Sequence, residues 1–192
     1  DLDKSQRPIN QKGSWDRILR SPYIKQADVL QGFYFFEDQF SDEALERHFD
    51  FYEPFTVHES SLSPCVHSIQ ATKLDRMEQA YTFYLRTSRL DLDDYNHEVH
   101  EGLHITSMAG TWMSIVEGFG GMRIKDNKLS FTPKIPKQWK GYSFKVNFRN
   151  HVIKVNVTQE QTHFEILSGS NLEILVNNKP LSLKNKVLRA VS

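Results

Sequence analysis

Residues 105–131 read ITSMAGTWMSIVEGFGGMRIKDNKLSF, and the spacing of the apolar side chains changes within this stretch. Before Gly118 they recur every three to four residues, as on one face of a helix, whereas after it they alternate, as on one face of a strand. Gly120-Gly121 predicts the end of the last helix, because glycine disfavours a helix interior. Asp126-Asn127 predicts a tight turn between two short strands. The fold therefore changes from helices to strands at these glycines.

The segment upstream, from Gln26 to Gly118, keeps the helical spacing of apolar residues. Ser41 before an acidic first turn, Ser63-Pro64 and Asp75 each resemble a helix start, since capping oxygens and negative charge satisfy the first amide groups and proline lacks the unpaired donor. A further helix is expected from Ile105 to Val116.

The segment downstream is predicted to form strands: Met122 to Lys125, Lys128 to Phe131, Tyr142 to Arg149, Val152 to Val157, His163 to Leu167 and Leu172 to Val176. With a turn at Asn150-His151, the last four predict an antiparallel meander with one apolar face. Helices followed by strands, without interleaving, predict an α+β chain in two parts. We place these parts at residues 1–119 and 120–192.

Composition limits the classes of function. With 39% hydrophobic residues among 192, the chain has enough apolar side chains for a globular core. Its 24 basic residues balance 24 acidic ones, so we expect neither nucleic acid nor an anionic membrane as a partner. The single cysteine, Cys65, cannot form an internal disulfide, which favours the cytoplasm. No apolar run is long enough to span a bilayer, and residues 1–20 do not resemble a signal peptide.

Three segments place polar residues just before predicted helices: Lys25-Gln26-Ala27-Asp28, His58-Glu59-Ser60-Ser61-Leu62-Ser63 and Glu101-Gly102-Leu103-His104. Helix N-termini favour anions, and adjacent serine hydroxyls add neutral donors, so a phosphate site is one interpretation. The alternative is structural: the serines cap helices, Lys25 and Gln26 form a solvated helix start, and His104 is a half-buried histidine.

His100-Glu101-Gly102-Leu103-His104 also matches the pattern in which two histidines on one helical turn bind zinc. That reading requires a continuous helix. Gly102 costs about 1 kcal/mol inside a helix, and the preceding Asp91 to Asn96 is polar and turn-like. The sequence therefore predicts no metal site here.

Taken in order, several stretches of the chain resemble the C-terminal part of glycoside hydrolase family 65, whose members include maltose, kojibiose and trehalose phosphorylases. They are Lys25 to Val29; Tyr52-Glu53-Pro54 with Thr56 and His58 to Ser63; Leu90-Asp91-Leu92; Glu101 to His104 with Met108-Ala109-Gly110 and Trp112; Gly118 to Arg123; and Phe131-Thr132-Pro133 with Pro136 and Trp139. The resemblance covers nearly the whole chain.

The resemblance implies the late helices of an (α/α)6 barrel in residues 1–119 and a small antiparallel sheet or sandwich domain in residues 120–192. It further implies that Lys25 and Gln26 bind the glucosyl unit of an α-linked glucose disaccharide, and that Ser60, Ser61 and His104 bind phosphate. Inorganic phosphate would be the co-substrate, with no cofactor and no metal. Its attack on the face opposite the leaving group would yield β-glucose 1-phosphate and glucose.

The segment that bears the family's catalytic glutamate has no counterpart here, and neither Glu59 nor Glu101 matches that acid. Without an acid to protonate the leaving oxygen, we expect the chain alone to be inactive. A partial barrel would also leave apolar helix faces uncovered, so we expect it to pair with the missing N-terminal part or to self-associate.

Two alternatives stay open. One is a noncatalytic module whose strand-rich half binds carbohydrate or supports a larger enzyme, although Trp139, Tyr142, Phe144 and Phe164 have the spacing of core residues. The other is a hydrolase of the same family. Hydrolysis would want a carboxylate base where Ser60-Ser61 lies, so the serine pair favours phosphate.

Overall fold

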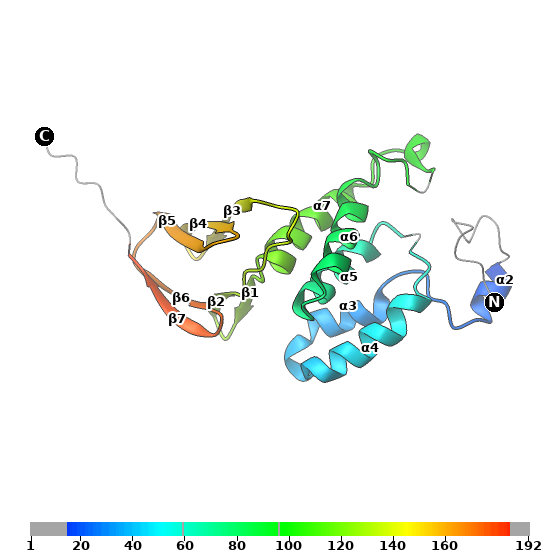
Figure 1. Ribbon diagram of the computed structural model, residues 1–192, viewed down its shortest axis with the longest axis horizontal. Coiled ribbons are helices and arrows are strands. Elements are labelled where there is room, and N and C mark those ends of the chain that lie inside the picture. The colour runs from blue at the N-terminus through cyan, green and yellow to red at the C-terminus, as the bar shows by residue number, and fades with distance from the viewer. Residues whose placement is uncertain (1–14, 59, 96, 185–192) are drawn as a thin grey trace, which may run out of the picture. The chain divides into compact units, whose positions relative to one another are not determined.

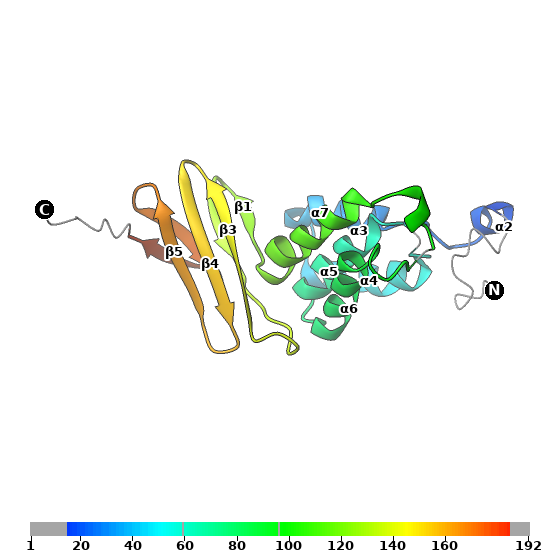
Figure 2. The ribbon, with the colours of Figure 1, turned by 90° about the horizontal axis from the view of Figure 1, so that it is seen from above.

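The computed structural model describes residues 15–58, 60–95 and 97–184, and the chain divides after Ile115 into a helical unit and a sheet unit (Figures 1 and 2). The order of helices followed by strands matches the predicted α+β class. In the described part of the chain, no helix has both the length and the apolar character needed to cross a membrane.

The described residues of the helical unit form one short α-helix followed by five longer ones. They are α2 (Trp15–Leu19), α3 (Asp28–Phe35), α4 (Asp42–Phe55), α5 (Ser63–Lys73), α6 (Met77–Ser88) and α7 (Ile105–Met113), with single 3-10 turns at η1 (Glu37–Gln39) and η2 (Val99–Glu101). The π-helical turn η3 (Ser114–Phe119) continues α7 as far as the glycines that were expected to end it.

Helix α5 is the centre of the helical unit, because every residue from Ser63 to Thr72 is buried. It packs against α3, α6 and α7 (Figure 1). Its polar side chains satisfy their hydrogen bonds inside the core: Ser68 Oγ donates to the Ala80 carbonyl at 3.0 Å, and Gln70 Nε2 donates to the Leu30 carbonyl at 3.0 Å. Buried polar groups need such partners, so these contacts lock α5 to its neighbours.

Of the predicted helix starts, the one at Ser41 is confirmed, because its Oγ accepts from the Ala44 amide at 3.2 Å. The prediction that Ser63 caps α5 is wrong. Ser63 is already helical, and its Oγ accepts instead from the Ala27 amide of a distant segment, at 3.0 Å. The start at Asp75 is also misplaced, because α6 begins at Met77 and Asp75 adopts a positive φ of 60° in the preceding turn.

The sheet unit is a sandwich of two small sheets. Its strands are β1 (Arg123–Lys125), β2 (Lys128–Phe131), β3 (Gly141–Phe148), β4 (His151–Thr158), β5 (Thr162–Ser168), β6 (Leu172–Val176) and β7 (Lys179–Leu183). One sheet has the order β1-β2-β6-β7 and the other β3-β4-β5, and Figure 1 shows them as separate layers. Both contribute buried side chains to one core, including Phe131 and Ile174 from the first sheet and Ile153 and Val155 from the second.

The predicted antiparallel meander holds for β3, β4 and β5 and fails at the next strand. Strand β6 leaves that sheet and pairs in parallel with β2, with Ser130 opposite Leu175 and Phe131 opposite Val176. Strand order depends on contacts between distant segments, which local alternation cannot report. The hairpin β6-β7 then completes the sheet.

Three hairpin turns follow the same local rule. Asp126 and Asn127 adopt positive φ of 47° and 65°, as the predicted turn requires. Arg149 with Asn150, and Asn177 with Asn178, do the same, so the turn expected at Asn150-His151 lies one residue earlier. These two-residue turns set the register of β1-β2, β3-β4 and β6-β7.

Two residues, Val116 and Gly121, mark the segment that connects the helical unit to the sheet unit. Val116 belongs to the core of the sheet unit although it still lies in the helical turn η3. Gly121 has φ +58°, and a Cβ there would come within 2.6 Å of the Thr132 carbonyl oxygen, so a larger residue would not fit. The backbone contacts therefore divide the chain between Ile115 and Val116, before the glycines.

Candidate functional site

The first two candidate segments are joined by a short parallel bridge between Ile24 and Thr56. The Ile24 amide donates to the Phe55 carbonyl at 2.9 Å, and the Val57 amide donates to the Ile24 carbonyl at 2.9 Å. The bridge therefore brings together the two segments that follow it in the sequence, Lys25-Gln26 after Ile24 and the serine segment after Thr56.

Gln26 and Ser60 are in direct contact. Ser60 Oγ donates to Gln26 Oε1 at 3.0 Å, and the Leu62 amide donates to Ser60 Oγ at 3.2 Å. Gln26 Nε2 donates to Asp28 Oδ1 at 2.9 Å, and the neighbouring Lys25 is exposed. The glutamine and the serine hydroxyl thus form one polar group from segments 34 residues apart.

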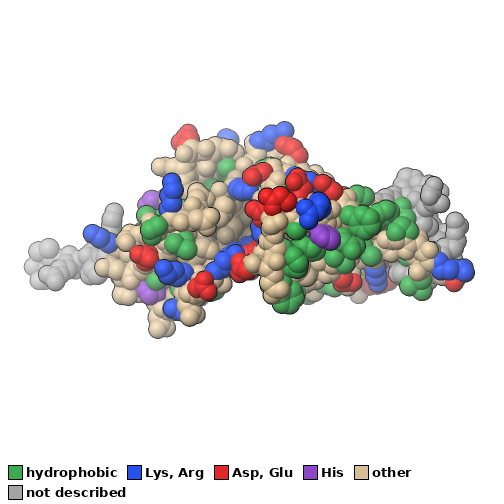
Figure 3. All heavy atoms as spheres, turned by 90° about the horizontal axis from the view of Figure 1, so that it is seen from below, with side chains coloured by type: hydrophobic (Ala, Val, Ile, Leu, Met, Phe, Trp, Pro, Cys, Tyr) green, Lys and Arg blue, Asp and Glu red, His purple; other side chains and the backbone are tan. Residues whose placement is uncertain are grey.

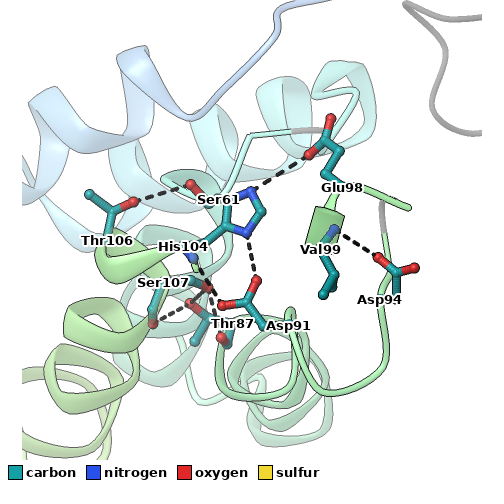
Figure 4. Close-up of polar contacts among 9 residues, drawn as sticks. All are labelled: Ser61, Thr87, Asp91, Asp94, Glu98, Val99, His104, Thr106 and Ser107. Carbon is teal, nitrogen blue, oxygen red and sulfur yellow. Dashed lines mark hydrogen bonds and ion pairs between the residues drawn. The ribbon is translucent and has the colours of Figure 1, made fainter. Parts of the chain in front are cut away.

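Ser61 reaches the third candidate segment through Thr106. The two hydroxyl oxygens lie 3.2 Å apart, and Thr106 is in the first turn of α7, directly after His104 and Ile105 (Figure 4). The three segments predicted from the sequence therefore converge through side-chain hydrogen bonds, from Gln26 to Ser60 and from Ser61 to the start of α7.

His104 is held between two carboxylates (Figure 4). Its Nδ1 lies 2.6 Å from Asp91 Oδ1, its backbone amide donates to Asp91 Oδ2 at 2.9 Å, and its Nε2 lies 3.7 Å from Glu98 Oε2. The hydrogen bonds from the His104 ring and amide hold the pKa of the Asp91 carboxyl below its usual value. Asp91 is therefore ionised at neutral pH.

His58 anchors the loop that carries Ser60 and Ser61. His58 has a positive φ of 59°, its Nε2 lies 3.1 Å from Glu53 Oε1, and its carbonyl accepts a hydrogen bond from the Arg86 guanidinium. The Arg86 guanidinium also lies 4.2 Å from the centre of the Tyr95 ring, in the loop between α6 and α7. One cation thus ties together the loops on either side of the site.

The start of α7 is fixed by close packing on α5 and α6. Ser107 Oγ donates to the Thr87 carbonyl at 2.7 Å. A Cβ at Gly110 would lie 2.8 Å from the Cys65 Cβ, so glycine is needed for the helices to approach this closely. Because His104 immediately precedes α7, this packing fixes the position of its backbone.

Helices α3, α5 and α7 begin at the three candidate segments, and none of them has a side-chain cap, in contrast to α4 with Ser41. Helix N-termini favour an anionic ligand, although the Asp28, Ser63 and Ile105 amides at these three already donate to backbone carbonyls. The site therefore combines three such helix starts with the hydroxyls of Ser60 and Ser61 and the imidazole of His104.

The zinc interpretation needs a helical turn that the structure lacks. Val99–Glu101 is a 3-10 turn, Gly102 has φ +120°, and α7 begins only at Ile105. His100 and His104 therefore do not share a helix face. Among the described residues, no group of three or more histidine, cysteine or acidic side chains could hold a metal ion.

The two glutamates weighed as acids differ in what can be said of them. The side chain of Glu101 is 69% exposed and lies beside His100. Glu59 lies outside the described residues. Sequence reasoning missed Asp91 as the partner of His104 and Arg86 as the partner of His58. For Asp91 the only signal was its place in the matched stretch Leu90-Asp91-Leu92.

A cavity of about 590 Å³ lies wholly within the sheet unit and contains none of the candidate residues. It is lined by Pro133 to Ile135, the turn between β4 and β5, and the end of β6 with β7. Phe144 and Phe164 pack against the core of this unit and contact Phe131, as their spacing predicted, while Trp139 contacts Phe119.

Comparison with known proteins assigns both units. Residues 1–113 match the glycosyl hydrolase family 65 central catalytic domain, and residues 122–183 match the family 65 C-terminal domain. The chain belongs to glycoside hydrolase family 65.

Its relatives include maltose phosphorylase of Bacillus subtilis, 52% identical over 98% of this chain, and α,α-trehalose phosphorylase of Thermoanaerobacter brockii, 39% identical over 96%. A solved structure described as "Putative kojibiose phosphorylase from human microbiome" superposes with a TM-score of 0.89 at 41% identity, over 96% of this chain and 27% of that one. The chain spans about a quarter of the length of these relatives, 25% and 24% of the two enzymes.

Proposed function

We propose that this chain supplies the phosphate-binding and glucosyl-binding residues of an inverting disaccharide phosphorylase. The reaction cleaves an α-glucosidic bond with inorganic phosphate and gives β-glucose 1-phosphate and glucose. Ser60, Ser61 and His104 bind phosphate, and Lys25 and Gln26 bind the glucosyl unit. The names of the relatives support a disaccharide and phosphate as substrates.

The observation that carries this proposal is the chain of contacts through the site. Gln26 Oε1 and Ser60 Oγ are 3.0 Å apart, and Ser61 Oγ and Thr106 Oγ1 are 3.2 Å apart. These contacts support the proposal because the residues proposed to bind glucose then neighbour those proposed to bind phosphate, as a reaction that joins glucose to phosphate requires.

The inventory of side chains suits phosphorolysis. An inverting hydrolase needs a carboxylate to deprotonate water, whereas phosphate at neutral pH is already an anionic nucleophile that mainly needs positioning. Hydroxyls and an imidazole position an anion without repelling it. The serine pair therefore favours phosphorolysis over hydrolysis in this family.

The general acid lies outside this chain in the proposal. We expect the purified chain, incubated with phosphate and maltose, trehalose, kojibiose or nigerose, to release no glucose 1-phosphate, because nothing protonates the leaving oxygen. Adding the preceding part of the catalytic domain from a relative should restore product. Product from the chain alone would mean that Glu59 or Glu101 is a working acid.

Matched serine variants test the phosphate role in the complemented enzyme. Ser60→Ala and Ser61→Ala should each raise KM for phosphate roughly tenfold, because a hydrogen bond to a charged group is lost. Ser88→Ala is the control, since its Oγ donates to the Leu85 carbonyl and is hydrogen-bonded to Tyr84 at the end of α6, away from Ser60 and Ser61. An unchanged KM for phosphate in both site variants would remove Ser60 and Ser61 from the phosphate site.

The apolar surface of the helical unit supports a partner. Figure 3 shows hydrophobic side chains gathered over that unit, and α7 exposes Ile105, Met108 and Trp112 at the spacing of one helix face. We propose that the preceding part of the catalytic domain covers this face, and that the chain self-associates when that part is absent.

Sedimentation velocity at increasing concentration tests this association. We expect the average mass to rise with concentration, and we expect Ile105→Lys to reduce the rise because it places a charge on the apolar face. Ile124→Lys, at an exposed position of the sheet unit, is the control. A monomer at every concentration would contradict the proposal.

A further inference from the structure

Both oxygens of Asp91 are used by the same residue. Oδ2 accepts from the His104 backbone amide at 2.9 Å, and Oδ1 lies 2.6 Å from His104 Nδ1. The Asp91 side chain is only 13% exposed, and the adjacent Leu90 is buried, which anchors the carboxylate. Asp91 therefore holds the backbone and the ring of His104 together.

An ionised carboxylate can only accept hydrogen bonds, and a backbone amide can only donate. The short contact to Asp91 Oδ1 therefore requires a hydrogen on Nδ1 of His104. The other ring nitrogen, Nε2, points away from Asp91 toward Glu98 (Figure 4), so it is the nitrogen left to meet a ligand.

We propose that Asp91 is a positioning residue that fixes the tautomer and orientation of His104, so that Nε2 alone is presented to phosphate. The inference rests on the proposed function for the identity of the anion, but the tautomer follows from the contacts alone. When the ring is protonated, Nε2–H donates to phosphate and Asp91 supplies the counter-charge. Glu98 is the carboxylate that faces Nε2.

Asp91→Asn distinguishes this role from a general structural one. The asparagine has a single acceptor oxygen, and the His104 backbone amide needs it. Its NH₂ group then faces Nδ1, which must give up its hydrogen, so the ring switches to the Nε2–H tautomer. The size of the side chain is nearly unchanged, while the direction of one hydrogen bond is reversed.

The first measurement is the ¹⁵N NMR spectrum of the histidine rings in the whole chain, recorded at alkaline pH, because the spectrum of a neutral ring shows which nitrogen bears hydrogen. We expect Nδ1–H for His104 in the unmodified chain and Nε2–H in Asp91→Asn. Glu98→Gln is the matched control, because it removes a carboxylate beside the same ring without touching Nδ1. It should keep Nδ1–H.

Either of two results would overturn the proposal: Nε2–H in the unmodified chain, which does not depend on the folding of a variant, or Nδ1–H retained in Asp91→Asn. The spectrum of the buried His67 reports whether each variant keeps the fold of the helical unit.

The second measurement is the KM for phosphate of the enzyme complemented with the preceding part of the catalytic domain. Asp91→Asn should raise it roughly tenfold, with a smaller change in kcat, and Ser88→Ala, outside the site, should leave it unchanged. A tautomer switch without a change in this KM would overturn the role toward phosphate. A complemented enzyme with no phosphorolysis at all would overturn the proposed function while leaving the tautomer result intact.

Discussion

The two units of this chain differ in how many large hydrophobic side chains they expose. Among the described residues of the sheet unit, the exposed large hydrophobic side chains are Ile124, Leu167 and Leu181. The helical unit exposes a longer set, which runs from Leu19 to Trp112 and includes Phe35, Leu103 and Ile105, each about two thirds exposed. The two sheets cover each other, whereas the helices cover only α5 on all sides.

This difference teaches that hydrophobic spacing reports which face of an element is apolar but not what covers it. In the sheet unit both partners of the core are present in one sequence segment. The helical unit matches the family's central catalytic domain, and the chain spans only about a quarter of the length of its relatives. We therefore expect the two units to respond independently to changes in their cores.

The largest expected effect is in the core of the sheet unit. Phe131→Ala should destabilise that unit by about 3–5 kcal/mol, because it leaves a cavity between the two sheets. Hydrogen exchange of the amides in β3 and β4 should accelerate, while exchange in α5 should not change. The exposed Ile124→Ala should have little effect. Equal acceleration in α5 would show that the units unfold together and break the comparison.

The second effect is a pH dependence confined to the helical unit. Burial, assisted by the neighbouring His58, lowers the pKa of His67 from 6.5 to about 3. The unfolded chain therefore binds a proton first as the pH falls, and stability is lost from pH 6.5 downward at up to about 1.4 kcal/mol per pH unit until about pH 3. Above pH 6.5 this contribution does not vary.

Denaturant unfolding at pH 7, 6 and 5, followed through the amides of α5, measures this slope. His67→Gln should flatten it, because its NH₂ can still donate to the Ser63 carbonyl but does not titrate. The exposed His100→Gln should leave the slope unchanged. The same slope in His67→Gln as in the unmodified chain would assign the pH dependence to other groups.

The smallest expected changes in stability come from alanine substitutions at two glycines of the helical unit. Gly110→Ala should destabilise it by about 1–3 kcal/mol, because the new Cβ would lie 2.8 Å from the Cys65 Cβ and 3.1 Å from Thr87 Oγ1. Gly32→Ala has nothing within 4 Å and should stabilise α3 by about 0.5–1 kcal/mol. Thermal unfolding of both variants checks the signs, and a neutral Gly110→Ala would mean that α5 and α7 can move apart.

The candidate site was predictable where its residues lie next to helix starts in the sequence. The segments that contain Ser60, Ser61 and His104 stood out because they precede α5 and α7, and the phosphate role of these three residues came from the family resemblance. Their partners were not found, because Asp91 is 13 residues from His104 and Arg86 is 28 residues from His58. Neither pair has a helical or strand spacing that could link its members.

The sequence by itself determined the local features of this protein. The change of period at Gly118 to Gly121, the cap at Ser41 and the turn at Asp126-Asn127 follow from the conformations that these side chains and glycines allow within a few residues. The tertiary structure decided the parallel pairing of β6 with β2, the use of Ser63 as a partner of Ala27, and the hold of Asp91 on His104. These three contacts depend on which distant segments meet when the cores form, and the spacing of neighbouring residues carries no information about that.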